Sequence, residues 1–454
     1  MDEKRNEFGD AVGGNIPPQE AVQKAQTQNG ANAPESVEAE IPETTVTCNV
    51  STDNDINDKE DPICGESIAM SVAAVSDDAG DVGNTADISD NSIDKYSDND
   101  DDDDPELLAR ELEAYLREQD DPDDGKGIFG GYIRLPAFIM LCIGVLAGAV
   151  HLVLALSTRF SDFMSVTVSA ALRFCLAKLT GVLPFSLAET LIFMLPAVII
   201  LLFVISNAYA ASKRKWWRFF FSLLAVISYM YSLFVFSFVP SYNCTKLEDR
   251  LGLDRHDVSA QQLYDTALVL TDEINSLTAD ITFLYKDASI MPYDIGELSD
   301  RICEAYDRFT PTHSFIQSMH TRIKPLAISP LMTYTHIAGV YAFYTGESNL
   351  NTNFPDYTIP YTVAHELAHQ RGIAREDEAN FIAYLVCMES DDVYIRYSAS
   401  MSVLEYVYSA LSQADTDLYN RAVGQLDLHA IYEMQSYSRF FAKYAGLVFR
   451  CLCQ

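Results

Sequence analysis

The stretch "YTVAHELAHQRGIAREDEANFIAY", residues 361–384, contains the residue types and spacing of a metal site. On a helix, His365 and His369 are four residues apart, so both imidazoles project from one face and can hold one Zn²⁺. Glu366 follows the first histidine and can reach a water bound to the metal without being a ligand. Such a carboxylate can take the water's proton and pass it to a leaving amine. The pattern therefore predicts metal-assisted hydrolysis, with Glu366 as the general base.

A catalytic zinc site also needs a third protein ligand, and one coordination position left open for water. The sequence offers two carboxylates shortly after the histidines, Glu376 and Glu378. Glu376 and Asn380 are four residues apart on a second predicted helix, so one can bind metal while the other orients a histidine. An acidic first turn that merely stabilises that helix is the alternative for both glutamates. We expect Glu376 to be the third ligand, with Glu378 as the alternative.

The elements around this motif are predicted to be mostly helical. Pro360 and Gly372 are typical of the start and the end of the motif helix. The segment "GVYAFY", residues 339–344, has the composition of a strand, and a polar Gly/Asn/Ser/Thr loop is expected after it. Apolar residues at three- and four-residue spacing, and helical composition after the motif, predict further helices at 259–285, 296–309, 375–388 and 392–412.

Three uncharged apolar runs precede this region, and each is long enough to span a bilayer. They cover residues 135–156, 190–210 and 219–239. A fourth apolar stretch, about 160–183, carries several charges and is predicted to be an interfacial or re-entrant helix rather than a span. The basic segment "SKRKWWRF" before the last run should stay in the cytoplasm, and its tryptophans suit that interface. The region after residue 240 is therefore expected outside the cytoplasm.

The N-terminal tail carries most of the protein's charge. Of the formal net charge of −34, residues 1–125 contribute −28, from 35 Asp and Glu against 7 Lys and Arg. Such a segment buries too little apolar area to fold, and it would repel the phosphates of nucleic acid. We expect a disordered cytoplasmic tail over 1–125, a membrane region over 126–240 and a folded domain over 241–454.

The motif "HELAHQRGIAREDEANFIAYL" and the preceding "SPLMTYTHIAGVYAFYTGESNLNTNFPDYTIP" resemble a bacterial membrane family catalogued as domain of unknown function 3810. The resemblance covers roughly residues 130–440 and includes "LPFSLAE". It implies a zincin-type, zinc-dependent peptidase domain outside the membrane. "EDEAN" is also similar to the E-x-x-A-D element of gluzincins, which implies that Glu376 is the third ligand. Asn380 stands in place of the Asp. In that fold the strand before the site helix lies along the substrate, which gives residues 339–344 that role.

The sequence thus predicts an α+β, predominantly helical protein with three transmembrane helices and an extracytoplasmic zincin-like domain containing a small sheet. We expect a multi-pass plasma-membrane zinc metallopeptidase that hydrolyses a peptide or envelope protein. The alternative is a membrane sensor or scaffold with a structural metal site, whose acidic tail recruits a cytoplasmic partner. No spacing singles out a residue that stabilises the oxyanion; the candidates are Tyr397, Tyr406, Tyr408, Tyr437, His429 and Arg439.

Overall fold

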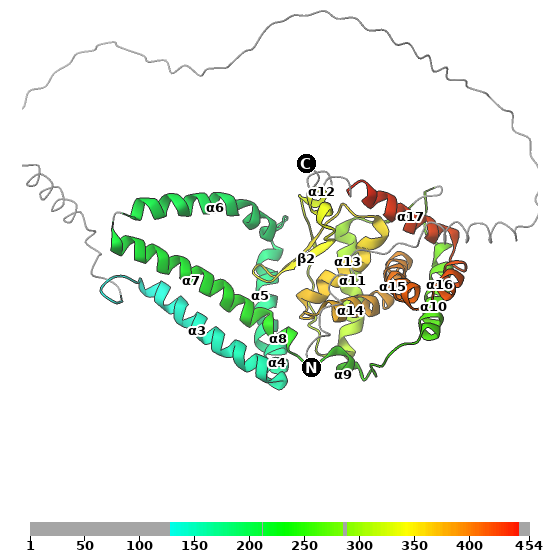
Figure 1. Ribbon diagram of the computed structural model, residues 1–454, viewed down its shortest axis with the longest axis horizontal. Helices are drawn as coiled ribbons and strands as arrows, with labels where there is room; N and C mark the ends of the chain where they lie inside the picture. Colours follow the sequence, from blue (N-terminus) through cyan, green and yellow to red (C-terminus); the bar gives the residue numbers. More distant parts are fainter. Residues whose placement is uncertain (1–127, 211, 285–287, 445–454) are drawn as a thin grey trace, which may run out of the picture. The chain divides into compact units, whose positions relative to one another are not determined.

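The computed structural model describes residues 128–210, 212–284 and 288–444, all of which belong to one compact unit (Figure 1). The acidic tail lies outside the described residues. The described part is mostly helical and contains one small sheet. This bears out the predicted class, a predominantly helical α+β protein.

Within the described residues, four helices are long and apolar enough to cross a membrane, which indicates a membrane-associated protein. The sequence predicted three such helices, so the second in the chain is an additional candidate. Two are α3 (Leu135–Leu156) and α6 (Leu187–Tyr209), and a third is α7 (Lys213–Ser237). The additional candidate is interrupted by a π-helical turn, and consists of α4 (Thr158–Met164), η1 (Ser165–Ser169) and α5 (Ala170–Gly181).

Two of these helices begin earlier than predicted, for reasons of capping. α7 already includes the basic residues that were assigned to a loop, because the Ser212 hydroxyl accepts a hydrogen bond from Lys215 N. α6 begins at Leu187 rather than residue 190, because the Glu347 carboxylate accepts from the first two amides of the helix. The charge and the apolarity of the sequence do not locate these two helix starts. The start of α6, for example, depends on Glu347, which lies 160 positions further along the chain.

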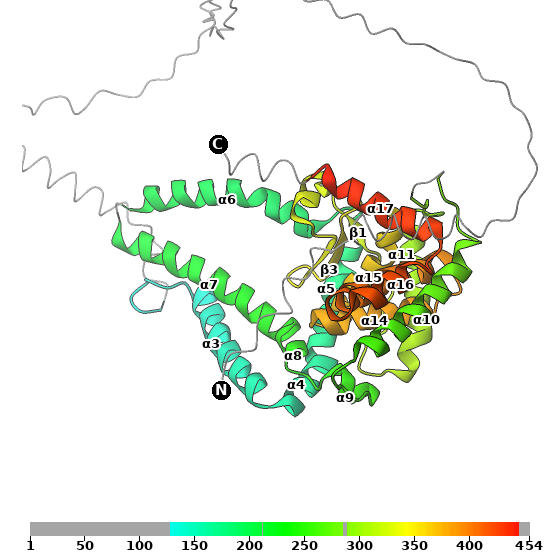
Figure 2. The same cartoon turned by 45° about the vertical axis from the view of Figure 1, so that its right-hand side comes forward.

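α3 and α7 run side by side in the same direction (Figures 1 and 2). At one end Arg218 of α7 donates to the carbonyl of Gly131, just before α3. At the other end Leu154 of α3 belongs to one buried cluster with Val235 and Val239. α4 and α5 run across these far ends, between α3 and α7 on one side and the C-terminal region on the other.

The C-terminal region contains ten helices among the described residues and a three-stranded sheet. The helices are α8 (Val239–Tyr242), α9 (Leu247–Leu251), α10 (Ala260–Thr278), α11 (Ile295–Phe309), α12 (Ser329–Met332), α13 (Ile359–Gln370), α14 (Glu376–Met388), α15 (Val393–Ala414), α16 (Thr416–Val423) and α17 (Leu428–Ala442). Single 3₁₀ turns are η2 (Thr310–Thr312), η3 (Thr333–Thr335) and η4 (Asp356–Thr358). Two buried clusters form the core; one surrounds α11, α13 and α14, and the other lies between α10, α15 and α17.

The sheet has the order β1–β3–β2, formed by β1 (Lys324–Pro325), β3 (Glu347–Leu350) and β2 (Gly339–Ala342). β3 is parallel to β1 and antiparallel to β2. The predicted strand is therefore present as β2, an edge strand. The prediction of a polar loop after it is wrong, because the polar residues of β3 are buried and satisfied inside the protein. Ser348 donates to Glu366 O, and Asn349 donates to Val340 O.

Candidate metal centre

Helix α13 carries His365, Glu366 and His369 through the interior of the C-terminal region. Pro360 stands in its first turn, where a missing N–H costs nothing. Glu366 and His369 are 5% and 7% exposed, and His365 is more open. Tyr306 donates its hydroxyl to the carbonyl of Ala364 at 2.7 Å, so the helix is held from the neighbouring α11. The two histidines are therefore presented by a rigid, buried helix.

A tight turn after α13 returns the chain to the histidines. Gly372 has φ +101°, a conformation that favours glycine, and Ile373 N donates back to Ala368 O. A Cβ on Gly372 would also lie only 2.4 Å from a guanidinium nitrogen of Arg173 on α5. The turn leads directly into α14, whose first residue is Glu376. Glycine is thus required both by the backbone and by the close approach of a membrane-region helix.

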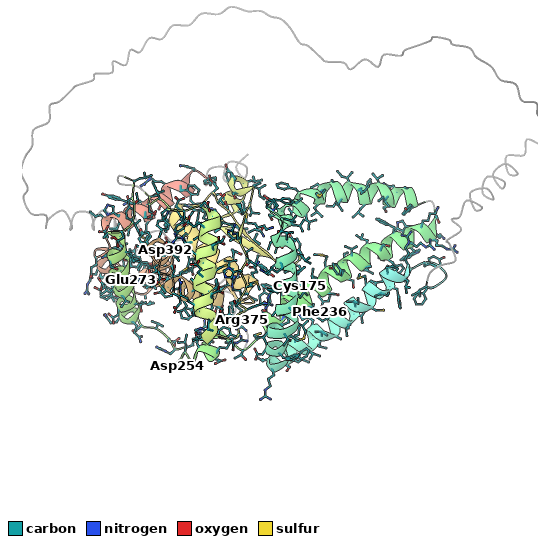
Figure 3. All side chains as sticks on the ribbon, turned by 180° about the vertical axis from the view of Figure 1, so that it is seen from behind. Cys175, Phe236, Asp254, Glu273, Arg375 and Asp392 are labelled. Atoms are coloured by element: carbon teal, nitrogen blue, oxygen red, sulfur yellow. The ribbon has the colours of Figure 1, made fainter. Side chains whose placement is uncertain are left out.

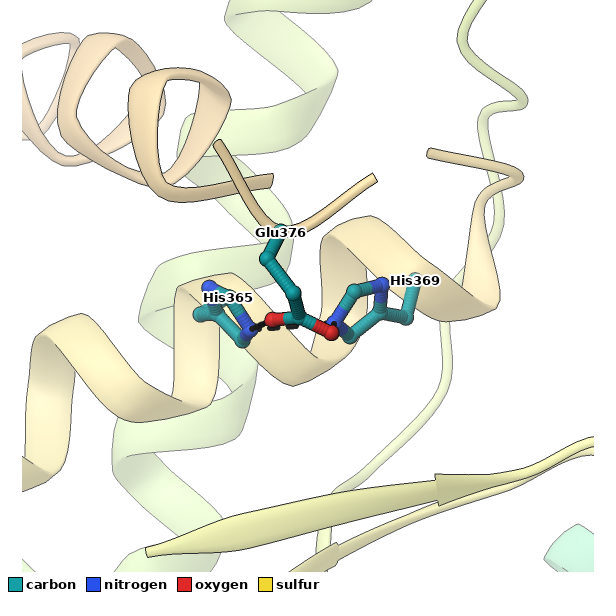
Figure 4. A group of neighbouring side chains, drawn as sticks. All are labelled: His365, His369 and Glu376. Atoms are coloured by element: carbon teal, nitrogen blue, oxygen red, sulfur yellow. Dashed lines mark hydrogen bonds and ion pairs between the residues drawn. The ribbon is translucent and has the colours of Figure 1, made fainter. Parts of the chain in front are cut away.

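The structure brings His365, His369 and Glu376 together, as Figure 4 shows. The two Nε2 atoms are 3.0 Å apart. The Glu376 carboxylate oxygens lie 3.2 Å from His365 Nε2 and 3.5 Å from His369 Nε2. The Glu376 side chain is 76% exposed, whereas the histidine side chains are 14% and 9% exposed. The group is therefore open toward solvent on the glutamate side.

These distances fit a tetrahedral zinc ion. Ligand atoms about 2.0–2.1 Å from a tetrahedral Zn²⁺ are separated from one another by about 3.3 Å. The two Nε2 atoms are 3.0 Å apart, and each lies 3.2 or 3.5 Å from a different oxygen of the Glu376 carboxylate, so these separations lie on both sides of that value. Two imidazole nitrogens and one carboxylate oxygen are also a donor set that Zn²⁺ prefers. The three residues present are thus a suitable site for this ion.

The hydrogen bonds of the rings support the same assignment. His369 Nδ1 lies 2.7 Å from the carbonyl of Ile373, so this nitrogen carries the proton and donates it. Its Nε2 then directs a lone pair into the cluster. The buried His365 Nδ1 finds no hydrogen-bond partner among the described residues. The orientation of His369 is consequently fixed by the same turn that positions Glu376.

The charges in the cluster shift one another's pKa. Hydrogen bonds to His365 and then His369 hold the pKa of Glu376 well below its usual range. Burial lowers the pKa of His369, but the hydrogen bond that its ring donates to the Glu376 carboxylate and the negative charges of Glu366 and Glu376 outweigh burial, so the net pKa is raised. Burial raises the pKa of Glu366, which the two histidines only partly oppose. Glu376 is thus the carboxylate most firmly held in its anionic form.

Glu378 and Asn380, the other two residues considered for the metal site, do not belong to the cluster. Glu378 Oε1 accepts from Leu247 N at 2.9 Å and from Arg375 at 3.0 Å, so it anchors α9 instead of joining the histidines. Asn380 donates to the Tyr406 hydroxyl at 3.4 Å. The expectation that Asn380 orients a histidine is not met, because the backbone carbonyl of Ile373 orients His369.

Edge strand β2 passes directly over the glutamate of α13. A Cβ on Gly339 would lie 2.6 Å from Glu366 Cγ and Oε1, so only glycine leaves room for the carboxylate. Glu366 Oε2 is buried and has no hydrogen-bond partner among the described residues. Sequence reasoning placed the strand but not this contact, and the glycine at the strand's start was the only signal for it.

Two tyrosines lie within electrostatic reach of Glu376. The pKa of Tyr406 is raised by burial, then by Glu405 and Glu376, and that of Tyr242 is raised by burial and Glu376. Sequence reasoning included Tyr406 but missed Tyr242. The other candidates serve packing or capping: Tyr397 donates to Glu433, and Tyr408 lies beside Thr271. His429 bonds to Asp427 at the start of α17, which also carries Tyr437 and Arg439.

The described residues thus form a membrane-associated helical protein with an open cluster of two histidines and a glutamate. The family model described as "Protein of unknown function (DUF3810)" matches residues 165–451. The chain belongs to this family, which agrees with the resemblance seen in the sequence. No curated protein and no solved structure matches the chain.

Proposed function

We propose that this protein is a zinc-dependent metallopeptidase, with His365, His369 and Glu376 as the metal ligands. One observation carries the proposal. Three donor atoms at zinc-compatible separations lie beside a buried carboxylate, that of Glu366, which is not part of the cluster. A purely structural site has no need of a base at this position. It is also closed on all sides, whereas Glu376 is exposed.

Glu366 is the proposed general base and acid. Its carboxylate takes a proton from the attacking water and delivers it to the amine of the departing product. A bound Zn²⁺ would supply the Lewis acidity that polarises the scissile carbonyl and lowers the pKa of water. Tyr242 and Tyr406 are both exposed residues, and their hydroxyls are the candidates for hydrogen bonding to the oxyanion.

The free edge of β2 is the proposed peptide-binding element. Among the described residues no strand pairs with that edge, because β2 is the last strand of its sheet. On the edge of β2 that faces β3, Asn351 N donates to Ala338 O. Because successive residues of a strand direct their N–H and C=O groups to opposite edges, those of Gly339 and Tyr341 point to the free edge. An extended peptide can add to these groups as a further strand. Its backbone would then pass beside Glu366, beneath Gly339.

We further propose three membrane crossings, with α4 and α5 lying along the membrane surface. The end of α3 and the end of α7 share a buried cluster. The start of α6 bonds to β3 through Ser186 and Asn349, also on the side of the C-terminal region. α4 and α5 therefore join two points on the same side. The basic residues that begin α7 favour a cytoplasmic position, which leaves the C-terminal region outside.

The zinc content of the full chain, purified in detergent, tests this proposal. We expect one zinc per chain in the wild type, its loss in His369→Ala, and its retention in Glu366→Gln and in the control His256→Ala. His256 is an exposed histidine remote in sequence from the motif. Wild type and His256→Ala, loaded with zinc, should cleave a randomised peptide library, while Glu366→Gln should not.

Two results would contradict the proposal. A wild type without zinc removes the metal site altogether. Zinc-loaded protein that cleaves nothing, with or without Glu366, favours a structural metal in a sensor or scaffold. The full chain is needed because Arg173 of the membrane region borders the Gly372 turn, so a fragment from residue 241 would lose that support.

A further inference from the structure

The candidate metal centre lies close to the end of a membrane helix. Phe238, the residue that follows α7, has its ring 6.5 Å from the ring of His369 and 5.3 Å from that of Tyr341 on β2. Arg173 of α5 donates to Ser237 O at 2.9 Å and also approaches Gly372. The site is therefore built directly against the membrane region rather than at the far side of the C-terminal region.

The length of α7 locates the surface of the bilayer. Trp216 and Trp217, beside the basic residues, mark one interface. From Trp217 to Phe238 the helical rise is about 32 Å, which matches a hydrocarbon core of about 30 Å. With α7 along the bilayer normal, the second boundary of the hydrocarbon core falls at Phe238. The headgroup layer beyond it is only about 5–8 Å thick, so His369 lies at headgroup depth.

The surface of the stretch α4–η1–α5, which lies between the membrane helices and the C-terminal region, supports this placement of the bilayer boundary. The continuous helical stretch α4–η1–α5 buries polar residues toward the protein; for example, Ser169 of η1 donates to Phe236 O at 2.6 Å. Figure 3 labels Cys175 of α5 and Phe236 of α7 at this junction. The same helices leave large apolar side chains exposed, which suits a helix lying on lipid, among them Phe163, Val166, Phe174 and Leu179.

Edge strand β2 leads from this boundary to the catalytic glutamate. Phe343, just after β2, has its ring 5.0 Å from that of Phe234, which is one turn inside the membrane end of α7. Gly339, at the other end of the strand, covers Glu366. Four residues of extended chain cover about 13 Å. A peptide added along β2 would therefore have one end at the hydrocarbon boundary and be cut about four residues away.

We propose that the substrate is a membrane-anchored polypeptide, cleaved in the segment that directly adjoins its transmembrane anchor. This inference rests on the proposed peptidase function. A chain anchored in the same bilayer holds its adjoining residues at the depth of the site, where the local concentration is of millimolar order. A soluble peptide must first enter the headgroup layer. Anchoring should therefore increase the cleavage rate about 100-fold over that of a soluble peptide at about 10 μM.

The test uses the full chain in lipid nanodiscs, loaded with zinc. Each nanodisc also carries a single transmembrane helix followed by a randomised 30-residue segment. The same segment without the helix is supplied as a soluble peptide in a parallel reaction. Mass spectrometry identifies the new termini and their rates of formation, and Glu366→Gln is the control for contaminating proteases.

We expect cleavage of the anchored substrate within about eight residues of the anchor, at least tenfold faster than cleavage of the soluble peptide. Equal rates for the two substrates, or cuts spread evenly over the 30 residues, would overturn the inference and leave the peptidase function intact. No cleavage of either substrate by the zinc-loaded protein would overturn the peptidase function together with the inference.

Discussion

Replacing Gly339 by alanine tests the contact between the edge strand and the proposed general base. The new Cβ would lie 2.6 Å from Glu366 Cγ and Oε1, whereas ordinary contacts are 3.4–4 Å. Glu366 must therefore move by at least about 0.8 Å. Displacement of a catalytic group by about 1 Å can reduce the rate about 100-fold. That loss corresponds to about 2.7 kcal/mol in the barrier for the chemical step.

The effect should be confined to kcat, because the three atoms nearest to a Cβ on Gly339 all belong to Glu366. We expect the Gly339→Ala protein to keep one zinc per chain and a KM within about threefold of the wild-type value. The assay is the cleavage rate of the fastest-cut library peptide, followed by mass spectrometry. Gly148→Ala is the matched control, since a Cβ there has nothing within 4 Å. A zinc-loaded Gly339→Ala protein with a kcat within twofold of wild type would refute the assigned role of Glu366.

Three further predictions concern stability, measured as thermal or denaturant unfolding of the full chain. Gly372→Ala should destabilise the protein by about 1–3 kcal/mol, because its φ of +101° strains any other residue. Lys324→Met should cost about 3–5 kcal/mol, since it leaves Glu347 buried without its ion-pair partner at 2.9 Å; the exposed Lys246→Met should cost under about 1 kcal/mol. Glu433 is fully buried, and burial raises its pKa from 4.5 to about 7. The folded protein therefore holds this proton where the unfolded chain releases it, so stability falls by about 3 kcal/mol as pH rises from 4.5 to 7. Glu433→Gln should remove that part of the pH dependence; an unchanged profile would contradict the assignment.

The sequence by itself determined the parts that depend on local patterns. The apolar runs located α3, α6 and α7 to within a few residues, except at capped starts, because a bilayer imposes a minimum length of apolar helix. The helices around the motif followed from their periodicity, and Pro360 and Gly372 mark the start and the end of α13. The helix predicted over 259–285 is shorter, because α10 ends at Thr278 and Phe283 forms a β-bridge with Ser289. The spacing of His365 and His369 placed both rings on one face of α13, since four residues make about one helical turn.

The sequence favoured Glu376 over Glu378 through its resemblance to gluzincins, and the tertiary structure shows what each of the two glutamates contacts. Both Glu376 and Glu378 lie in the first turn of α14, and their sequence context is nearly the same. The direction in which the Gly372 turn returns the chain takes Glu376 to the histidines, while Glu378 bonds to Leu247 N, 131 positions away. No local pattern encodes such a contact, because it depends on how α9 and α14 meet.

The same limit explains β3 and the position of the site. β3 reads as a polar loop, yet it is the central strand, because its side chains find partners in α6, α13 and β2. The proximity of His369 to Phe238 joins residues 131 positions apart and could not be seen in either segment alone. The sequence supplied the histidine and glutamate spacing on which the proposed chemistry depends, and the apolar helices that indicate membrane association. The packing of α5, α7 and β2 around α13 decided that the histidine cluster lies beside the end of α7. Only long-range contacts can fix the distance between a helix end and a buried turn.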